Sequence, residues 1–514
     1  THCISSAASD VYKRQLQVRP NMLYRWMNYQ QFVRSKQMRA SNRTRLYSQY
    51  RQEQVQEKLS QLGIFSYMDM QYAPRDTTAA CDTLDVTMQA TFAKPLDAEL
   101  ELNVVTKSND QTGPGASFGV TRNNVFGGGE SWNVKLKGSY EWQTGGGEKS
   151  SLMNSWEMGL STSLTFPRVV FPHLGKREFD FPATTTFRLY INQLNRAKYY
   201  KLLSFGGNAT YDFQPSRTSR HSITPFKLTF NVLQHQSEDF KEIAEANPAL
   251  YVSLRNQFIP AMEYTYTYDN ASGRRIKNPI WWQSTVTSAG NITSLIYRAF
   301  GKPFNEEDKS LLGAPFAQFV KLNTELRHLW NIDKNNAIAS RMAVGALFTY
   351  GNATIAPYSE QFYVGGANSI RAFTVRSVGP GGYHPEEGKY SYLDQTGTFR
   401  FEANVEYRFR IFKSFWGATF LDAGNVWLLR KDRKLLADGK EARPNSQLRL
   451  KTFPKQIALG TGVGIRYDMD ILVFRLDFGI PLHLPYDTER SGYYNVTGAF
   501  FKNLGIHFAI GYPF

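Results

Sequence analysis

Hydrophobic and polar residues alternate along most of the chain after residue 95. In residues 399–411, FRFEANVEYRFRI, the odd positions are aromatic or aliphatic and the even positions are polar or charged. Residues 456–468 and 472–480 show the same alternation. Because successive side chains of a β-strand point to opposite faces, each segment is predicted to be a strand with one apolar face. Strands in globular proteins average about 5–6 residues, whereas these, at roughly 9–13, suit a tilted crossing of a lipid bilayer.

About sixteen segments of this kind follow one another to the end of the chain. They lie near residues 96–106, 115–126, 130–143, 153–167, 183–195, 201–213, 220–235, 257–269, 280–291, 315–331, 336–350, 398–412, 415–428, 456–468, 471–481 and 503–514. An even number of antiparallel strands can close on itself and leave no unpaired edge in lipid. The pattern therefore predicts a mainly β fold, a sixteen-stranded antiparallel transmembrane β-barrel over residues 96–514.

The connections between these segments alternate in length. Two are tight, at 413–414 and 469–470, and three are long and polar, at 351–397, 430–455 and 483–502. Short turns on one side and long loops on the other are typical of outer-membrane barrels, whose short turns are periplasmic. With an even strand count, both ends of the barrel are expected on the periplasmic side.

Residues 16–95 have a different pattern and are predicted to form a small α+β domain. The order is two helices followed by two short strands, near residues 20–32, 42–62, 64–72 and 84–92. Gly63 follows the second helical segment, where a helix-terminating glycine is common. Residues 1–15 open on Thr1 and fit no designed element, so we interpret them as a probable non-native or mis-assembled leader.

Composition narrows the class of protein. The 514 residues carry 60 Lys and Arg against 44 Asp and Glu, a net charge of +16, and 14 % of them are aromatic. The uncharged apolar stretches are shorter than the roughly 20 residues that a spanning helix needs. Two cysteines exclude a disulfide scaffold and a cysteine-based zinc site. The positive charge favours anionic lipid and lipopolysaccharide over nucleic acid, because Lys and Arg fall mostly in loops and on the predicted lumen faces.

A search for catalytic motifs is negative. The eight histidines are scattered singly, and the sequence contains no HExxH motif. The glycines of Gly460-Thr-Gly462-Val-Gly464 resemble a phosphate loop, but they lie inside an alternating strand and begin no helix. Glycines on the lumen side of a strand more often mark the close packing of another segment. We expect a protein that is not an enzyme, with no cofactor and no metal site.

The C-terminal segment, NLGIHFAIGYPF, is predicted to be the last strand. In an extended strand one face carries only apolar and aromatic residues, namely Ile506, Phe508, Ile510, Tyr512 and Phe514. Gly505, Gly511 and Pro513 weaken the ladder of this strand, since proline lacks the N–H and glycine packs no side chain. The first and last strands, 96–106 and 504–514, are therefore expected to meet at a weak seam.

Two further motifs contain candidate functional residues. The loop at about 352–397 includes GGANSIRAF, in which Gly365 and Gly366 precede Ile370, Arg371 and Phe373. The strand FLDAGNVW places Asp422 within an apolar sequence and is followed by Gly424 two residues later. A buried acid needs a partner, and an arginine inside the lumen is the obvious candidate.

These three motifs together resemble the BamA/TamA family of outer-membrane assembly proteins, closest to the TamA-like members of Bacteroidetes. The resemblance covers about residues 16–514. It implies a sixteen-stranded barrel after periplasmic POTRA domains, the last of which residues 16–95 partly match. It also implies that the loop folds into the lumen, where Arg371 pairs with Asp422 and Glu406. Ala372 stands where the family usually has glycine, so a positive φ there would strain the loop.

The resemblance implies a function in the bacterial outer membrane. The protein would fold and insert client β-barrels, or export surface proteins, by β-augmentation at the seam. Expected partners are outer-membrane lipid and lipopolysaccharide, unfolded outer-membrane proteins or lipoproteins, and periplasmic or inner-membrane assembly factors that bind the POTRA region. The alternative is a passive pore or a two-partner-type secretion channel on the same barrel. We also expect a wet lumen, into which Arg475 and Asp477 point.

Overall fold

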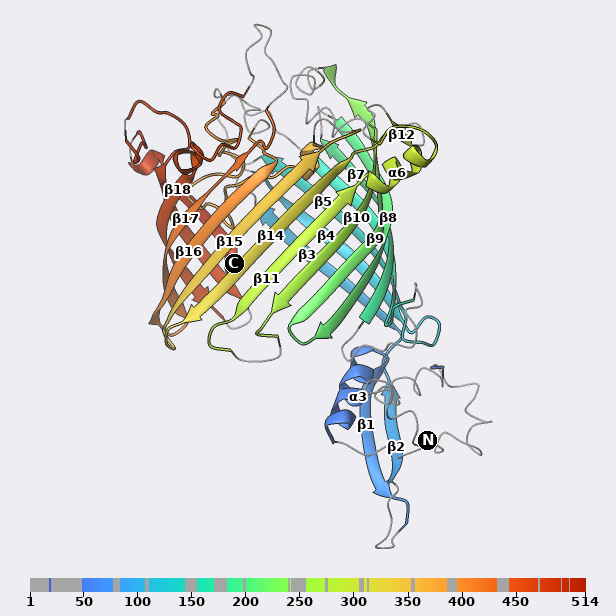
Figure 1. Cartoon of the computed structure of the whole chain (residues 1–514). Coiled ribbons are helices and arrows are strands. Elements are labelled where there is room, and N and C mark those ends of the chain that lie inside the picture. The colour runs from blue at the N-terminus through green and yellow to red at the C-terminus, as the bar shows by residue number, and fades with distance from the viewer. Residues whose placement is uncertain are drawn as a thin grey trace, which may run out of the picture.

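The computed structural model contains one large curved β-sheet and a small unit of one helix and two strands (Figure 1). It describes residues 18–19, 49–76, 84–106, 111–143, 155–170, 183–196, 200–238, 241, 256–272, 276–304, 309–311, 314–352, 356–385, 395–431, 443–469, 472–490, 492–498 and 500–514. The predicted leader at 1–15 and the predicted first helix at 20–32 lie outside the described residues.

The small unit consists of helix α3 (Gln49–Gln61) packed on an antiparallel hairpin of β1 (Phe65–Pro74) and β2 (Leu84–Phe92). The helix ends before Gly63, whose φ of 64° is the left-handed conformation that stops helices. The helix and the hairpin bury their apolar side chains in one cluster, which is formed by Val18, Val55, Leu59, Ile64, Met68 and Met70. The predicted helix and two strands of this part are confirmed.

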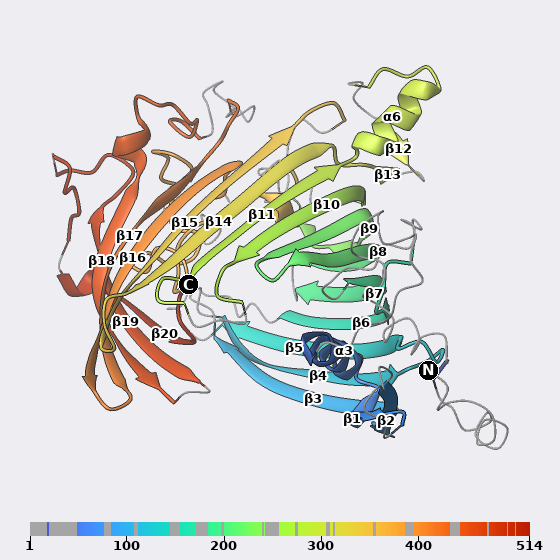
Figure 2. The same ribbon diagram turned by 60° about the horizontal axis from the view of Figure 1, so that its bottom comes forward.

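Sixteen strands form the large sheet, as predicted. They are β3 (Leu96–Thr106), β4 (Gln111–Asn123), β5 (Ser131–Gln143), β6 (Ser155–Phe166), β7 (Ala183–Arg196), β8 (Tyr200–Ser216), β9 (Ser219–Gln236), β10 (Gln257–Asp269), β11 (Ile280–Ala289), β14 (Phe319–Asn331), β15 (Asn336–Thr349), β16 (Phe399–Phe412), β17 (Phe415–Trp427), β18 (Ala458–Asp468), β19 (Val473–His483) and β20 (Gly505–Ile510). Each strand pairs antiparallel with its neighbours in chain order, which curls the sheet into a barrel (Figure 2).

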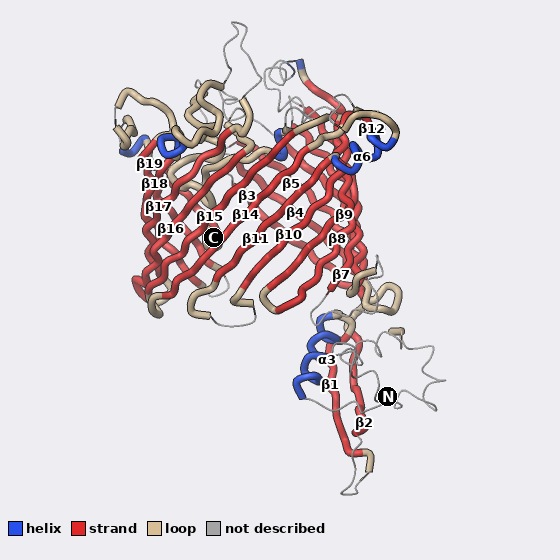
Figure 3. The backbone as a smooth tube through the Cα atoms, in the orientation of Figure 1, coloured by secondary structure: helices blue, strands red, loops and turns tan. Residues whose placement is uncertain are grey.

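The connections differ between the two rims of the barrel (Figure 3). Tight turns follow β8, β14 and β16 at the rim beside the small N-terminal unit. In the two-residue turn after β16, Lys413 has a φ of 42°. The long connections after β11, β15, β17 and β19 lie at the opposite rim.

The strand register confirms the predicted apolar outer face. Phe474 lies opposite Tyr467 and Ile510 on its two neighbouring strands, and Phe478 lies opposite Val463 and Ile506. These rows form the outer surface of the wall, which explains why many large apolar side chains are exposed. On the other face of β19, the register aligns Arg475 and Asp477 with lumen residues.

The last strand is shorter than predicted. β20 ends at Ile510, because Gly511 adopts a φ of 88° and turns the chain out of the ladder. Beyond it, the guanidinium of Arg408 lies over the ring of Tyr512 at 4.3 Å and over that of Phe514 at 5.8 Å. Arg408 belongs to the lumen row of β16, so the last residues turn inward. The expectation that Tyr512 and Phe514 continue the outer apolar face is wrong.

The sheet begins at β3 and ends at β20, and these two are its edge strands (Figure 2). No strand pairing joins them in the part of the chain that the structure describes. Apolar side chains on the outer face of both strands are exposed: the exposed fraction is 74 % for Leu102 and 67 % for Phe508.

Helices outside the N-terminal unit are short. Helix α6 (Asn291–Ala299) follows β11 after Gly290 and was not predicted from the sequence. Three single-turn 3-10 helices lie in the connections, namely η3 (Tyr358–Glu360), η5 (Phe453–Gln456) and η6 (Phe500–Lys502). The connection after α6 also contains a short antiparallel pair of strands, β12 (Ser310–Leu311) and β13 (Ala314–Pro315). No helix among the described residues is long and apolar enough to cross a membrane.

Candidate functional site

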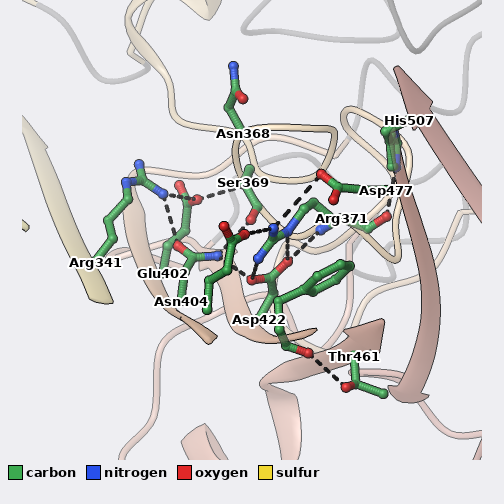
Figure 4. Close-up of polar contacts among 12 residues, drawn as sticks. Arg341, Asn368, Ser369, Arg371, Glu402, Asn404, Asp422, Thr461, Asp477 and His507 are labelled. Carbon is green, nitrogen blue, oxygen red and sulfur yellow. Dashed lines mark hydrogen bonds and ion pairs between the residues drawn. The ribbon is translucent and has the colours of Figure 1, made fainter. Parts of the chain in front are cut away.

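The connection between β15 and β16 carries Arg371 into the lumen, where it is completely buried. Its guanidinium donates from Nε to Asp422 Oδ2 at 2.8 Å and from Nη2 to Asp422 Oδ1 at 2.9 Å. Its backbone N–H donates to the same carboxylate at 3.0 Å. A bidentate pair with an extra backbone bond fixes both the side chain and the loop that carries it (Figure 4).

Three more groups surround this guanidinium, one of which is Asp477, whose Oδ2 lies 3.9 Å from Nη1. Nη1 donates to Glu406 Oε2, and the guanidinium carbon lies 3.5 Å from the centre of the Phe420 ring. Glu406 and Asp422 are buried on the neighbouring strands β16 and β17. We name Arg371, Glu406 and Asp422 the Arg371 cluster.

Other charges on the strands extend the Arg371 cluster. Glu406 also accepts from Arg408 at 2.8 Å and from Arg466 at 3.1 Å. Arg466 forms an ion pair with Asp477 at 2.6 Å. Arg475 donates to Asn368 Oδ1 in the loop at 2.6 Å. Cations and carboxylates thus alternate through the buried network, which offsets the cost of removing each charge from water.

A second set of contacts holds the loop at Ser369, two residues before Arg371 (Figure 4). Ser369 donates to Glu402 Oε2 at 2.7 Å, and Arg341 donates to the same oxygen at 3.0 Å. Asn404 donates to the carbonyl of Ser369 at 2.7 Å and to Asp422 Oδ1 at 2.9 Å. Asn404 therefore links this set to the Arg371 cluster.

The apolar residues of the loop pack in the lumen as well. Ile370 and Phe373 join one buried cluster with Val364 and with Phe319 and Leu347 of the wall. The ring of Phe362 occupies the space over Gly345, where an added Cβ would meet it. The loop is therefore held by an apolar core in addition to the ion pairs.

Glycines on the strands make room for this loop. A Cβ on Gly479 would lie 2.7 Å from the carbonyl oxygen of Arg371, and one on Gly460 would overlap the methyl group of Ala372. Ala372 is absent from the described non-glycine residues with positive φ, so the expected strain there does not arise. Gly460 provides the space that the alanine methyl needs.

The remaining predicted loop and strand glycines lie around the same segment. Gly365 has a φ of 101° and donates its N–H to Ser369 Oγ, and Gly366 has a φ of 93° and donates its N–H to the Phe373 carbonyl. Gly424 lies in β17 opposite Glu402. A Cβ on Gly424 would meet the carbonyl of Phe401 at 2.5 Å.

The last strand also contacts the loop. His507 Nε2 donates to the Arg371 carbonyl at 2.7 Å, and Gly505 lies beside the same carbonyl. Phe508 points to the outer face, and Gly511 begins the inward turn of Tyr512, Pro513 and Phe514. The two groups of predicted site residues, in the loop and in the last strand, thus meet at the backbone of Arg371.

Arg466, Asp477 and His507 also belong to this site, and none of the three was predicted there. The alternation of apolar and polar residues in β18 and β19 places Arg466 and Asp477 on the lumen face. The sequence of a single strand does not indicate which of its lumen charges contact the loop. The expectation of a wet lumen is wrong at Arg475 and Asp477, since both are buried under the loop. Within the described ranges no three His, Cys, Asp or Glu side chains are grouped to hold a metal ion.

The Omp85 superfamily domain matches residues 124–514, which include fourteen of the sixteen strands, all except β3 and β4. The chain belongs to the Omp85 superfamily. Together with the sixteen-stranded barrel, this identifies a bacterial outer-membrane protein of the assembly and transport class. It agrees with the predicted likeness to BamA and TamA proteins.

A solved BamA structure shares the fold of this chain. BamA from Haemophilus ducreyi lacking POTRA domains 1–3 matches with a TM-score of 0.61 and 13 % identity, over 96 % of this chain and 81 % of that one. CdiB from Acinetobacter baumannii matches with a TM-score of 0.46 and 12 % identity, over 86 % and 66 %. CdiB from Escherichia coli matches with 0.43 and 12 %, over 89 % and 70 %.

Proposed function

We propose that this Omp85 protein is a non-enzymatic insertion or translocation factor, which folds client β-barrels or exports surface proteins by β-augmentation. A client strand pairs with the exposed edge of β3 before it leaves into the lipid. No nucleotide is needed, because the client gains free energy by burying apolar surface and by satisfying its backbone groups.

One observation carries the proposal: the sheet has two edges, β3 and β20, without a described ladder between them. In hydrocarbon, each unpaired backbone N–H or C=O costs several kcal/mol, so a bare edge strongly favours pairing. The six-residue length of β20 and the turn at Gly511 limit the ladder that it can offer to β3. A longer client strand would pair with more of β3's eleven residues.

The loop around Arg371 supports an assembly role over a passive pore. Its ion pairs and its apolar cluster occupy the lumen next to β14 to β20, where an open pore would need water. His507 joins the loop to the edge strand, so a change in β20 is transmitted to the loop. The secretion channel remains the second candidate function, because a channel could use the same loop as its gate.

The domain arrangement is part of the proposal. We place residues 16–95 in the periplasm as a partial POTRA-like domain, and the barrel at 96–514 in the outer membrane. The N-terminal unit lies at the rim with the tight turns (Figure 1), which is the periplasmic rim of outer-membrane barrels. It would bind assembly partners, while the barrel contacts lipid, lipopolysaccharide and unfolded clients.

A disulfide across the seam tests the mechanism. Leu100→Cys on β3 is combined in turn with Ile506→Cys, Phe508→Cys and Ile510→Cys on β20, and insertion of a client barrel is measured before and after reduction. Oxidation is expected to abolish insertion and reduction to restore it. The matched control joins Val405→Cys to Leu421→Cys, which lie directly opposite each other on β16 and β17. Full insertion with the seam locked would exclude opening from the mechanism.

A further inference from the structure

Helix α6 has its polar and apolar sides reversed relative to a helix on a soluble protein. Thr293 and Ser294 are buried, whereas Ile292, Leu295 and Ile296 are about half exposed. Phe300, directly after the helix, is 84 % exposed. A surface helix in water buries its apolar stripe against the protein, so this arrangement is the opposite of what aqueous solvent favours.

The polar side of α6 is held by specific contacts with the barrel rim. Lys309 Nζ donates to Ser294 Oγ at 3.2 Å. The hydroxyl of Tyr350 donates to Asn291 Oδ1 at 2.9 Å. Gly290, with a φ of 71°, donates its N–H to the carbonyl of Pro260 at 2.7 Å, and this bond fixes the start of the helix on β10. These contacts fix the rotation of the helix and keep its apolar side turned away from the protein.

The helix lies outside the wall of the barrel. Tyr297 packs on Phe316, with ring centres 6.2 Å apart, and Phe316 bridges to Phe258 of β10. Phe258 pairs with Phe230, whose side chains belong to the outer row. An apolar groove of about 880 Å³ continues along this outer row from Phe258 toward Phe205 and Trp132. Figure 1 shows α6 at the rim of the barrel near β10. The exposed apolar side of the helix is thus continuous with the surface that faces lipid.

Basic residues border the apolar side. Arg298 lies in the last turn, and Lys302 follows four residues later with its ammonium 5.5 Å from the Tyr297 ring. The first turn of the helix has no acidic residue. Cations beside an apolar helix face are the pattern of helices that lie in the membrane interface, where they meet lipid phosphates.

We propose that α6 is an interfacial membrane helix, which places Ile292, Leu295, Ile296 and Phe300 among the lipid chains at the barrel rim. Arg298 and Lys302 bind the phosphate groups of the same leaflet. The helix anchors the connection between β11 and β14 to the lipid surface, far along the sheet from both edge strands. This proposal does not depend on whether the protein inserts or secretes its clients.

Site-directed spin labels test the position of the helix. Leu295→Cys and Phe300→Cys, in a chain with Cys3→Ser and Cys81→Ser, are labelled and reconstituted in vesicles of phosphatidylethanolamine and phosphatidylglycerol. Glu489→Cys, in an exposed part of the connection after β19, is the control. At residues 295 and 300, the ratio of collisions with oxygen to collisions with a water-soluble nickel chelate is expected to be several-fold higher than at 489. Equal ratios at all three sites would overturn the proposal, as would shielding of 295 and 300 from both reagents, which would mean a protein cover.

The phosphate contact is tested separately. Arg298→Glu with Lys302→Glu is expected to raise nickel collisions at residue 295 in vesicles that contain phosphatidylglycerol, and to have a much smaller effect in vesicles of phosphatidylcholine. The same change in both vesicles would overturn the electrostatic part of the proposal. Circular dichroism and the heat-dependent gel mobility of the barrel verify that the variants fold.

Discussion

The two halves of the barrel use the same lumen residue types in different surroundings. In β3 to β11, Lys137 pairs with Glu157 at 2.6 Å, and the two side chains are 51 % and 37 % exposed. A cavity of about 290 Å³ lies beside them, lined by Arg188 and Asn192. In β14 to β20, Arg466 pairs with Asp477 at the same distance, and both side chains are completely buried.

The difference is made by the loop and not by the strands. Both halves alternate in the same way, but the segment around Arg371 lies against the lumen charges of the second half. An exposed ion pair contributes about 0–1 kcal/mol, whereas removing one partner of a buried pair costs roughly 3–5 kcal/mol. By covering the lumen charges of the second half, the loop buries them, so that the loss of one ion-pair partner there destabilises the fold.

The largest expected effect comes from Arg371→Ala, which leaves Asp422 and Glu406 buried with fewer partners. We expect a loss of about 3–5 kcal/mol, less where water enters the space. Assembly activity should fall more than surface abundance, and the loop should become accessible to protease. The matched variant Lys137→Ala, in the wet half, should change stability by only about 0–1 kcal/mol. Full activity with an unchanged protease pattern for Arg371→Ala would contradict the role of the cluster.

Phe474→Arg tests the outer face, which is common to both halves. A charge toward lipid should cost roughly 2–4 kcal/mol near the midplane of the bilayer and less near an interface. Ser139→Arg is the control, because Ser139 faces the wet lumen directly opposite Glu157. Arg475→Phe is not a mild control, because Arg475 is buried against the loop. Equal losses of heat-stable folded barrel for Phe474→Arg and Ser139→Arg would contradict the assigned faces.

Gly479→Ala adds one methyl group against the backbone of the loop. Because its Cβ would lie 2.7 Å from the Arg371 carbonyl oxygen, we expect overpacking of about 1–3 kcal/mol. In the wet half, Gly119→Ala places its Cβ 3.9 Å from Asn133 Nδ2 and should be nearly neutral. The unfolding temperature of the two variants in detergent measures the contrast, and a neutral Gly479→Ala would mean that the loop adjusts freely.

The smallest expected effect on stability comes from the exposed ion pair of Arg75 and Asp85 in the N-terminal unit. Arg75 donates to Asp85 at 2.7 Å, and this hydrogen bond lowers the pKa of Asp85 below its ordinary value of 3.8. Since the pKa is lower in the folded state, the stabilisation is fully present above that ordinary value and is lost as the pH falls through the folded pKa. Arg75→Ala should raise the pKa of Asp85, as measured by carboxyl NMR, with little change in stability. An unchanged pKa would show that the pair does not persist in solution.

Some features followed directly from the sequence. Strict alternation located the strands, and it separated the outer row of Phe474 and Phe478 from the lumen row of Arg475 and Asp477, because a strand has a period of two residues. Arg371, Glu406 and Asp422 were grouped only through the family resemblance, since residues that are distant in the chain carry no local signal of contact.

The tertiary structure decided which lumen residues lose their water. Arg475 and Lys137 look alike in sequence, but only the first is covered by the loop. It also decided the inward turn at Gly511, the presence of α6, which was not predicted from the sequence, and the rotation of that helix, which turns Ile292, Leu295 and Ile296 outward. Local alternation determines the face on which a side chain lies, whereas burial depends on what the rest of the chain places against that face.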